Sequence, residues 1–249
     1  MKKFYAAAFC AALTILCAAQ EKDNNGLIFS ANFDNFSAKA DFASGKAENG
    51  SLKSDLSARK FSGVAGKGNA VCLKGSERIT WSANKNFNPQ QGTVSFWISP
   101  RKWNYNKKGL ASFFETRFGK YLFAIYEENN YGTFSFVICT YSPKYTEIGQ
   151  VRFRMPAKNW QMGVWHKIDA VWNNKMMLIY LDGVPAVKKP CNFSKAADFP
   201  ATGPGRWMIL GWGKKGMEDE TAFDDLKIYN RVLTAAEIKS EYEKVIPAK

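Results

Sequence analysis

The sequence has a single histidine, His166, among its 249 residues. One imidazole cannot build a multi-histidine metal centre, and metal-assisted or Ser-His nucleophilic chemistry lacks its usual parts. The five cysteines include no pair at the CxxC spacing of metal ligands. Because there is also no arginine-rich tract, zinc-finger spacing or helical basic stripe, nothing in the sequence indicates a nucleic-acid partner.

Long apolar runs are scarce too. The longest lies in MKKFYAAAFCAALTILCAAQ, where Lys2 and Lys3 precede apolar residues up to Ala19. It is shorter than the roughly 20 residues that span a bilayer, and its basic start and small residues before Ala19 are typical of a secretory signal peptide. We expect cleavage of residues 1–19 and export to the periplasm, the cell surface or the extracellular space. A lipid anchor on Cys17 is less favoured, because the preceding TIL lacks the small residue of a lipoprotein signal.

Removal of the signal peptide leaves three cysteines, Cys72, Cys139 and Cys191, in a compartment that permits disulfides. An odd count allows at most one bridge within the chain, and which two residues would form it stays open. Since small buried cysteines are commoner than reactive ones, we assign them no chemistry.

Charge is of one dominant sign, with 35 basic and 22 acidic residues and a formal net charge of +13. Loss of Lys2 and Lys3 leaves about +11 by the same count. An exported basic surface would attract acidic glycans or other anionic partners, with an affinity that weakens as salt rises. The alternative, which we favour here, is that scattered lysines keep an exported domain soluble.

Short apolar or alternating runs separated by turn-forming residues predict an all-β domain. Asn173-Asn174 and Asp182-Gly183, which tolerate positive φ, predict a three-stranded meander over 164–186. Because no helices separate the strands, they must bury their apolar faces on one another, and we expect a two-sheet antiparallel jelly-roll sandwich. The expected strands are 27–33, 70–74, 78–82, 93–99, 110–117, 121–127, 133–140, 150–155, 164–172, 176–181, 207–211 and 222–230.

The chain shows no internal repeat and no linker after residue 26, so we expect one domain over residues 25–245. The irregular stretch 38–58 is either a long loop or a pair of weak edge strands. One helix is expected over 234–244, where Thr234 and Glu237 form a capping box.

Five motifs together resemble one family: GTVSFWISP (92–100), VWHKIDAVW (164–172), MLIYLDGVPA (177–186), WMILGWG (207–213) and AFDDLKIYNRVLTAAEI (222–238). In order and spacing they are similar to bacterial laminin-G-like domains of the concanavalin A-like lectin/glucanase superfamily. The weaker matches LIFSANFDN (27–35) and GVAGKGNAVCLKG (63–75) extend the resemblance over nearly the whole exported chain. It implies the jelly-roll fold and leaves function open, since this superfamily includes lectins, polysaccharide hydrolases and lyases, and adhesion modules.

The resemblance also implies one structural calcium ion. In similar domains an aspartate at the start of the last strand helps to bind it, and Asp224 matches that position, with Asp34 and the Gly68 carbonyl as companions. Strict alternation would place Asp224 on one face with Leu226 and Ile228, where a carboxylate needs a partner such as an oxygen-seeking cation. The alternative is that Asp224 only accepts backbone hydrogen bonds.

Hydrolases of this superfamily carry acidic residues at alternate positions of one inner strand. MEDET (217–221) has the wrong pattern and lies in an expected loop, and Glu115 stands alone, whereas glycosidic cleavage requires two carboxylates roughly 5–10 Å apart. His166 lies in WHK, where similar non-catalytic domains commonly carry a structural histidine. We therefore expect no enzyme activity.

Recognition then depends on exposed aromatic residues. We expect Trp81, Trp97, Trp165, Trp172 and Trp207 in the core, because they lie within strands. Exposed stacking platforms are expected in two polar loops, RKWNYNKKG and GWGKKG. The candidate ligand-binding residues there are Trp103, Tyr105, Trp212, Lys107 and Lys214, flanked by Arg101, Lys102, Lys108 and Lys215. The alternative is that these aromatic residues cap the ends of the sandwich.

The sequence thus predicts an exported, non-catalytic binding module whose ligand is a carbohydrate, with an acidic glycan as one candidate. Two alternatives stay open: a polysaccharide hydrolase or lyase of the same fold, and a protein-binding adhesion or assembly module.

Overall fold

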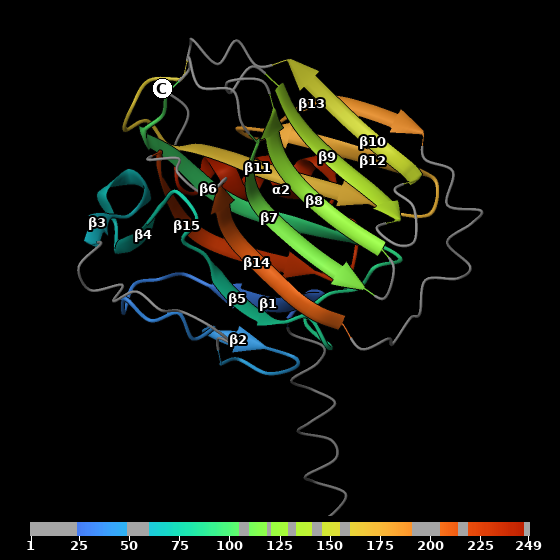
Figure 1. Ribbon diagram of the computed structural model, residues 1–249, viewed down its shortest axis with the longest axis horizontal. Helices are drawn as coiled ribbons and strands as arrows, with labels where there is room; N and C mark the ends of the chain where they lie inside the picture. Colours follow the sequence, from blue (N-terminus) through green and yellow to red (C-terminus); the bar gives the residue numbers. More distant parts are fainter. Residues whose placement is uncertain are drawn as a thin grey trace, which may run out of the picture.

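The predicted strands form two sheets that pack face to face, which confirms the jelly-roll sandwich (Figure 1). The computed structural model describes residues 24–48, 60–104, 110–118, 121–128, 133–140, 146–154, 160–190, 205–213 and 219–246. The expected signal peptide lies outside these residues, as does Cys191. Within them, Cys72 and Cys139 are buried. No helix in this part of the chain has both the length and the apolar character to cross a membrane.

One sheet has nine strands, paired antiparallel throughout, and includes the predicted meander. Strand β15 is at its centre, because it pairs with β6 on one side and with both β1 and β4 on the other. The irregular 38–58 region contributes the short edge strand β2. The strands are β13 (Val184–Pro190), β12 (Met176–Leu181), β11 (His166–Trp172), β6 (Gly92–Lys102), β15 (Glu220–Tyr229), β1 (Leu27–Ala31) and β2 (Phe42–Ala43), with β4 (Asn69–Lys74) beside β15 and β3 (Lys60–Ser62) beside β4.

The other sheet has six antiparallel strands and lies in front of the first in Figure 1. The predicted strands from the middle of the chain are neighbours in this sheet. The later strand β14 lies between β7 and β5. The strands are β10 (Thr146–Arg154), β9 (Thr133–Thr140), β8 (Tyr121–Glu128), β7 (Leu110–Phe118), β14 (Gly205–Gly213) and β5 (Ile79–Ser82).

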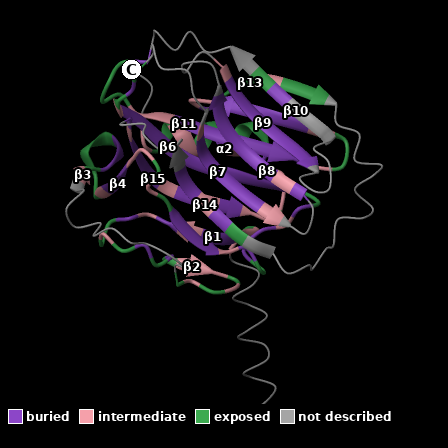
Figure 2. Cartoon of the chain, in the orientation of Figure 1, coloured by how far each residue is buried: buried purple, intermediate pink, exposed green. Residues whose placement is uncertain are grey.

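Aromatic side chains fill the space between the sheets, where Figure 2 shows the strands almost wholly buried. Phe87 stacks on Trp172 with ring centroids 5.1 Å apart and meets Phe123 edge-on at 5.1 Å. The indole nitrogens of Trp81 and Trp172 donate to buried carbonyls, those of Ala38 and Pro89. Both tryptophans therefore satisfy their one polar group inside the core, as buried indoles require.

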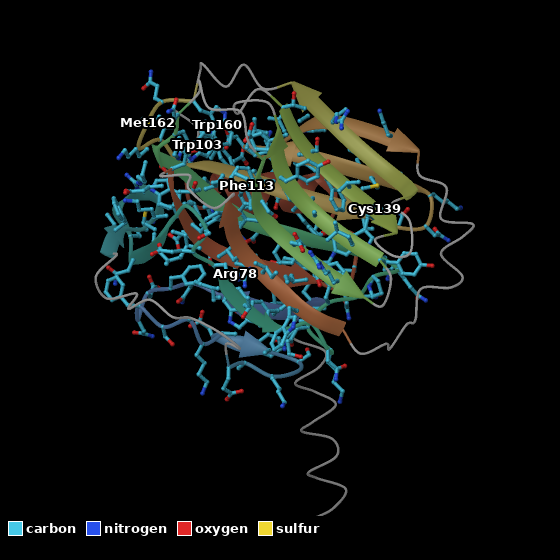
Figure 3. All side chains as sticks on the ribbon, viewed as in Figure 1. Arg78, Trp103, Phe113, Cys139, Trp160 and Met162 are labelled. Atoms are coloured by element: carbon cyan, nitrogen blue, oxygen red, sulfur yellow. The ribbon has the colours of Figure 1, made fainter. Side chains whose placement is uncertain are left out.

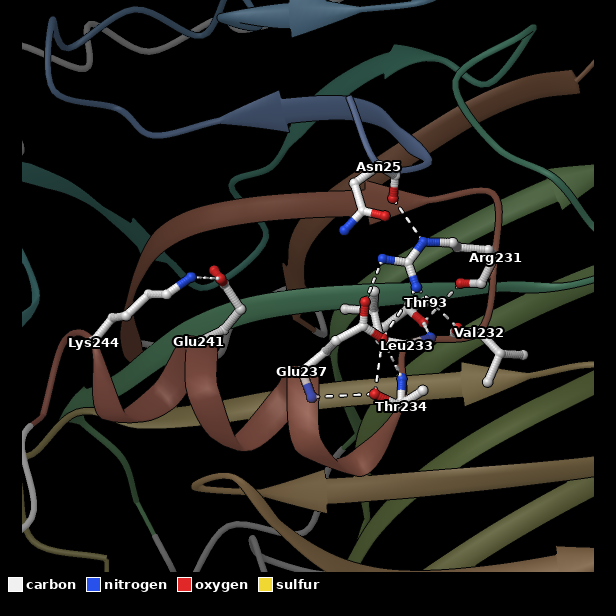
Figure 4. Close-up of polar contacts among 9 residues, drawn as sticks. All are labelled: Asn25, Thr93, Arg231, Val232, Leu233, Thr234, Glu237, Glu241 and Lys244. Atoms are coloured by element: carbon white, nitrogen blue, oxygen red, sulfur yellow. Dashed lines mark hydrogen bonds and ion pairs between the residues drawn. The ribbon is translucent and has the colours of Figure 1, made fainter. Parts of the chain in front are cut away.

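The predicted helix is α2 (Ala235–Glu243), and its capping box is confirmed: the Thr234 side chain accepts from the Glu237 N–H, and Glu237 accepts from the Thr234 N–H (Figure 4). Arg231 holds the carboxylate of Glu237 at 2.6 Å and donates to the Asn25 carbonyl at 2.7 Å. The guanidinium lowers the pKa of Glu237 to about 2. Ile238 packs on the outer face of the nine-stranded sheet. The helix is thus tied to the first described residues and to the sheet.

Two turns join the strands of the meander by different means. Asp182 and Gly183 both have positive φ, as predicted for a tight hairpin. At the other turn the predicted reason was wrong, because neither Asn173 nor Asn174 has a positive φ. Instead the Asn173 side chain accepts hydrogen bonds from the backbone N–H groups of Lys175 and Met176. A local side-chain acceptor therefore substitutes for left-handed backbone there.

A buried ion pair lies on the outer face of the nine-stranded sheet. The Lys167 ammonium contacts the Asp169 carboxylate at 2.5 Å, and the Asp169 side chain is 0% exposed. The second Asp169 oxygen is buried without a hydrogen-bond partner. The charge of Asp169 therefore depends on Lys167 for compensation.

We expect Lys167→Met to lower the free energy of unfolding by roughly 3–5 kcal/mol, because it leaves an unpaired buried carboxylate. The double variant Lys167→Met/Asp169→Leu should recover most of this loss. Urea unfolding measures both, with Lys175→Met, at an exposed turn, as the matched control that should change little. A Lys167→Met variant as stable as the wild type would contradict the role given to this pair.

Candidate functional site

Trp103, expected to be exposed, is buried at the end of β6. Only 5% of it is exposed, and its ring stacks on Phe113 and Trp160 with centroids 5.9 and 5.8 Å away. Its indole nitrogen donates to the Thr221 hydroxyl at 2.9 Å. Figure 3 shows Trp103, Phe113 and Trp160 gathered at one end of the sandwich. The expected stacking platform at Trp103 is therefore wrong, because aromatic rings from distant segments enclose it.

The remaining predicted ligand-binding residues are only partly placed. Trp212 lies in β14 opposite Ser112 of β7, and its side chain is outside the described residues. Tyr105, Lys107 and Lys214 also lie outside them. A site shared by the two predicted loops thus stays a prediction, and Trp103 is no longer one of its residues.

The prediction was also wrong for Trp207, which is exposed rather than core. Met208 and Leu210 of β14 enter the core, so alternation turns Trp207 to the outer face of the six-stranded sheet. Half of the residue, 50%, is exposed. It pairs with Ser82 of β5 on one side. On the other side, a register shift between Gly205 and Met208 leaves two residues, Arg206 and Trp207, across from Arg117 of β7.

Arg117 is held in position by Glu115, two residues earlier on the same face of β7. The guanidinium Nε lies 2.8 Å from a Glu115 oxygen, and the Glu115 side chain is 8% exposed while that of Arg117 is 38% exposed. Leu122 of β8 lies opposite Arg117, and small or apolar side chains continue across β8 and β9. We call Ser82, Glu115, Arg117, Leu122 and Trp207 the Trp207 face. It combines one half-exposed indole, one oriented guanidinium and neighbouring apolar side chains.

The chemistry of this face differs from that of a glycosidase. Among the side chains that the structure describes, Glu115 is the one carboxylate on the outer face of the six-stranded sheet, and it is already paired with Arg117. Asp219, in the acidic MEDET stretch, is buried and accepts from the Asn104 N–H at 3.0 Å. In the described structure Glu115 is thus paired with a guanidinium, and Asp219 accepts from a backbone N–H.

His166 is engaged in packing. Its ring stacks on Trp160 with centroids 3.9 Å apart, and its Nδ1 lies 2.8 Å from an Asp182 oxygen in the β12–β13 turn. The same Asp182 accepts from the Lys167 N–H. These contacts join the start of β11 to the turn, in line with a structural histidine.

The predicted calcium residues converge on one loop. The Asp224 carboxylate accepts from the Val64 N–H at 2.9 Å, and the Asp34 carboxylate accepts from the Asn69 N–H at 2.9 Å. Between these positions, a Cβ on Gly68 would lie 1.9 Å from an Asp34 oxygen. Two carboxylates thus approach opposite ends of the 63–69 segment, and a glycine makes room for one of them.

The expected alternation around Asp224 is wrong, because β15 contains a β-bulge. Asp225 has a positive φ, and the register to β6 shifts between Asp224 and Lys227. Phe223 therefore shares the core face with Leu226, while Asp224 points to the outer face beneath the 63–69 segment. Asp225 pairs with Lys227 at 2.9 Å. The two adjacent aspartates accordingly have separate partners.

Electrostatics at Asp224 favour a proton or a cation. The residue is 5% exposed, and burial raises the pKa of Asp224 to about 7, with Asp225 and Asp34 adding to the rise and the Val64 N–H opposing it. All the donors are carboxylate or carbonyl oxygens, the ligands that Ca²⁺ prefers. The described residues contain no cluster of three or more acidic, histidine or cysteine side chains, so backbone carbonyls would have to complete any such site. The donor chemistry fits calcium.

A model of the concanavalin A-like lectin/glucanases superfamily, of laminin-G-like type, matches residues 73–239. No curated protein matches the sequence. The receptor binding domain of botulinum neurotoxin D is similar in structure, with a TM-score of 0.68 and 16% identity over 90% of this chain and 54% of that one. The binding domain of Paraclostridial Mosquitocidal Protein 1 has a TM-score of 0.68 and 17% identity over 90% and 53%. This chain thus spans about half the length of these domains, and at such identities the likeness shows a shared fold.

We expect the carboxyl of Asp224 to make stability depend on pH when metal is chelated. Its folded pKa of about 7 is above the ordinary 3.8, so the folded chain keeps a proton that the unfolded chain has released. Stability from this group is present below about pH 4 and is lost as pH rises to about 7, by roughly 2–4 kcal/mol.

Urea unfolding in EDTA between pH 4 and 8 checks this expectation. Asp224→Asn keeps an acceptor for the Val64 N–H and cannot ionise, so the wild type should lose stability relative to it over that range. If the stabilities of the two proteins change in parallel with pH, the expectation is wrong, because the pKa of Asp224 is then not raised by folding.

Proposed function

Because the chain belongs to the concanavalin A-like lectin/glucanases superfamily, we propose that it is an exported, non-catalytic module that binds carbohydrate through the Trp207 face. The observation that carries this proposal is the half-exposed indole of Trp207 on a strand of the six-stranded sheet. An aromatic side chain of this size on the outer face of a sheet is costly to leave in water, and it offers a flat surface for a sugar ring.

Polar groups beside the indole supply orientation. Arg117 presents N–H donors next to Trp207, and its Nε contact with Glu115 limits its freedom. A guanidinium fixed in this way loses little further entropy when it hydrogen-bonds a sugar hydroxyl. The similar structures are a receptor binding domain and a binding domain, which supports recognition rather than turnover for this chain.

A glycan array on the exported chain, followed by calorimetry on the hits, tests the proposal. Trp207→Ala should weaken binding about fivefold, because one stacking contact contributes on the order of 1 kcal/mol, and it should change stability by less than about 1 kcal/mol. Val184→Ala, which truncates a 64% exposed residue on the other sheet, is the matched control and should bind normally. If Trp207→Ala binds as tightly as the wild type, the Trp207 face is not the binding site. Shortened glycan products after incubation would show that the protein is an enzyme.

We also propose that Asp224 and Asp34, with the Gly68 carbonyl, hold one structural Ca²⁺. Bound there, the ion would neutralise the buried carboxylate of Asp224 and connect the segment after β1 to β15. The support is the convergence of both acids on the 63–69 segment and the raised pKa of Asp224.

Calcium at a hundred times its Kd should stabilise the folded state by about 2.7 kcal/mol, measured as a rise in Tm. Asp224→Ala should abolish the rise. Asp225→Asn is the matched control, because Asp225 lies next in sequence, pairs with Lys227 and sits at a positive φ that asparagine tolerates. If EDTA and calcium give the wild type the same Tm, the metal site does not exist.

A further inference from the structure

Arg101 stands on the outer face of the nine-stranded sheet, near the end of β6. Its guanidinium carbon lies 4.6 Å from the centre of the Phe61 ring and 5.4 Å from that of Trp165. Phe61 comes from β3, and Trp165 from the segment just before β11. Trp165 is partly exposed rather than core as predicted. Three distant segments therefore hold one guanidinium among aromatic rings.

This guanidinium has no anionic partner in the part of the chain that the structure describes. No carboxylate there contacts Arg101, and burial lowers the pKa of its guanidinium. Its Nε is buried without a hydrogen-bond partner, as is the Ser99 hydroxyl two residues earlier on the same face of β6. Partial desolvation without a counter-charge is unfavourable, so the surroundings favour a bound anion.

The direction of approach is also defined. Aromatic rings cover the guanidinium face, and Nη1 is directed toward Gly163, where an added Cβ would lie 3.6 Å away. Gly163 is exposed, so the terminal nitrogens face a surface without a side chain. A ligand can reach them along the edge of the guanidinium, which is the edge that accepts a bidentate oxyanion.

We propose that Arg101, with Phe61 and Trp165, forms a binding site for an oxyanion, a carboxylate or sulfate group carried by an acidic glycan. The oxyanion follows from the unpaired guanidinium. The choice of a glycan rests on the proposed function and on the partly exposed Trp165 ring, which lies next to the charge and can stack on the sugar that carries it. This site is on the opposite sheet from the Trp207 face.

Binding is measured by calorimetry and tryptophan fluorescence with tetragalacturonate and with its methyl-esterified form, which is the same oligosaccharide without the charges. We expect the wild type to bind the charged form at least tenfold more tightly. Sulfated and unsulfated dextran oligosaccharides provide the sulfate arm, and a preference for the charged member of either pair supports the site. No preference in either pair overturns it.

Arg101→Lys should weaken binding of the charged form about tenfold, because lysine keeps the charge and loses the planar fork. Lys188→Ala, at an exposed position of β13, is the matched control for loss of a positive charge and should change affinity less than twofold. Thermal unfolding verifies that Arg101→Lys is folded. No loss in Arg101→Lys would overturn the site, and a loss in Lys188→Ala as large as that in Arg101→Lys would show that binding is not specific to Arg101. Trp207→Ala separates the two proposals, since it should leave the preference for the charged form unchanged.

Discussion

The pairing of β15 with three other strands is the constraint on which the rest of the molecule depends. One edge of β15 pairs with β6 along its length, whereas the other pairs with β4 over Glu220–Phe223 and with β1 over Leu226–Tyr229. The β-bulge at Asp224 and Asp225 falls where the partner changes from β4 to β1. A regular strand there would keep its hydrogen-bonding groups in register with only one of the two partners.

That bulge also determines what the two aspartates do. Because Asp225 takes a left-handed conformation, Asp224 turns outward and accepts from the Val64 N–H, in the connection between β3 and β4. Val64 begins a short 3-10 turn whose backbone needs an acceptor at this point. The carboxylate therefore serves the segment that leads into β4, at the energetic cost of its own burial. A calcium ion bound there would neutralise a carboxylate whose position the strand topology already requires.

Much of the fold could be predicted from the sequence, because it depends on patterns of neighbouring residues. Alternation located the central strands, Asp182-Gly183 the hairpin, and Thr234 with Glu237 the start of the helix. The short strand β3 was missed, and β2 was expected only as one of two readings of the 38–58 stretch, because two or three residues give no alternation to detect. The face of Asp224 was mispredicted for a related reason: an extra residue in a bulge reverses the alternation, and nothing in FDDL marks its place.

The candidate sites were harder, because the exposure of an aromatic ring depends on what distant segments place over it. Trp103 follows a strand in a polar stretch and is buried by Phe113 and Trp160, while Trp207 lies within an apolar strand and is exposed. The core between the sheets accepts rings only from inward positions, so β14 buries Met208 and Leu210 and must leave Trp207 outside. Alternation from the buried Met208 could have found it.

The same reasoning explains why the two proposed ligand sites lie on different sheets. Among the described residues, large aromatic rings fill the inner faces of the two sheets, so both proposed sites use side chains on the outer faces. On the nine-stranded sheet α2 covers the outer face around Ile238 and Leu178, which leaves the corner at Arg101. On the six-stranded sheet the exposed indole is at β14. The two sites differ in charge. Arg117 forms an ion pair with Glu115 and can orient a neutral sugar, whereas no described carboxylate pairs with Arg101, which therefore favours an anionic ligand.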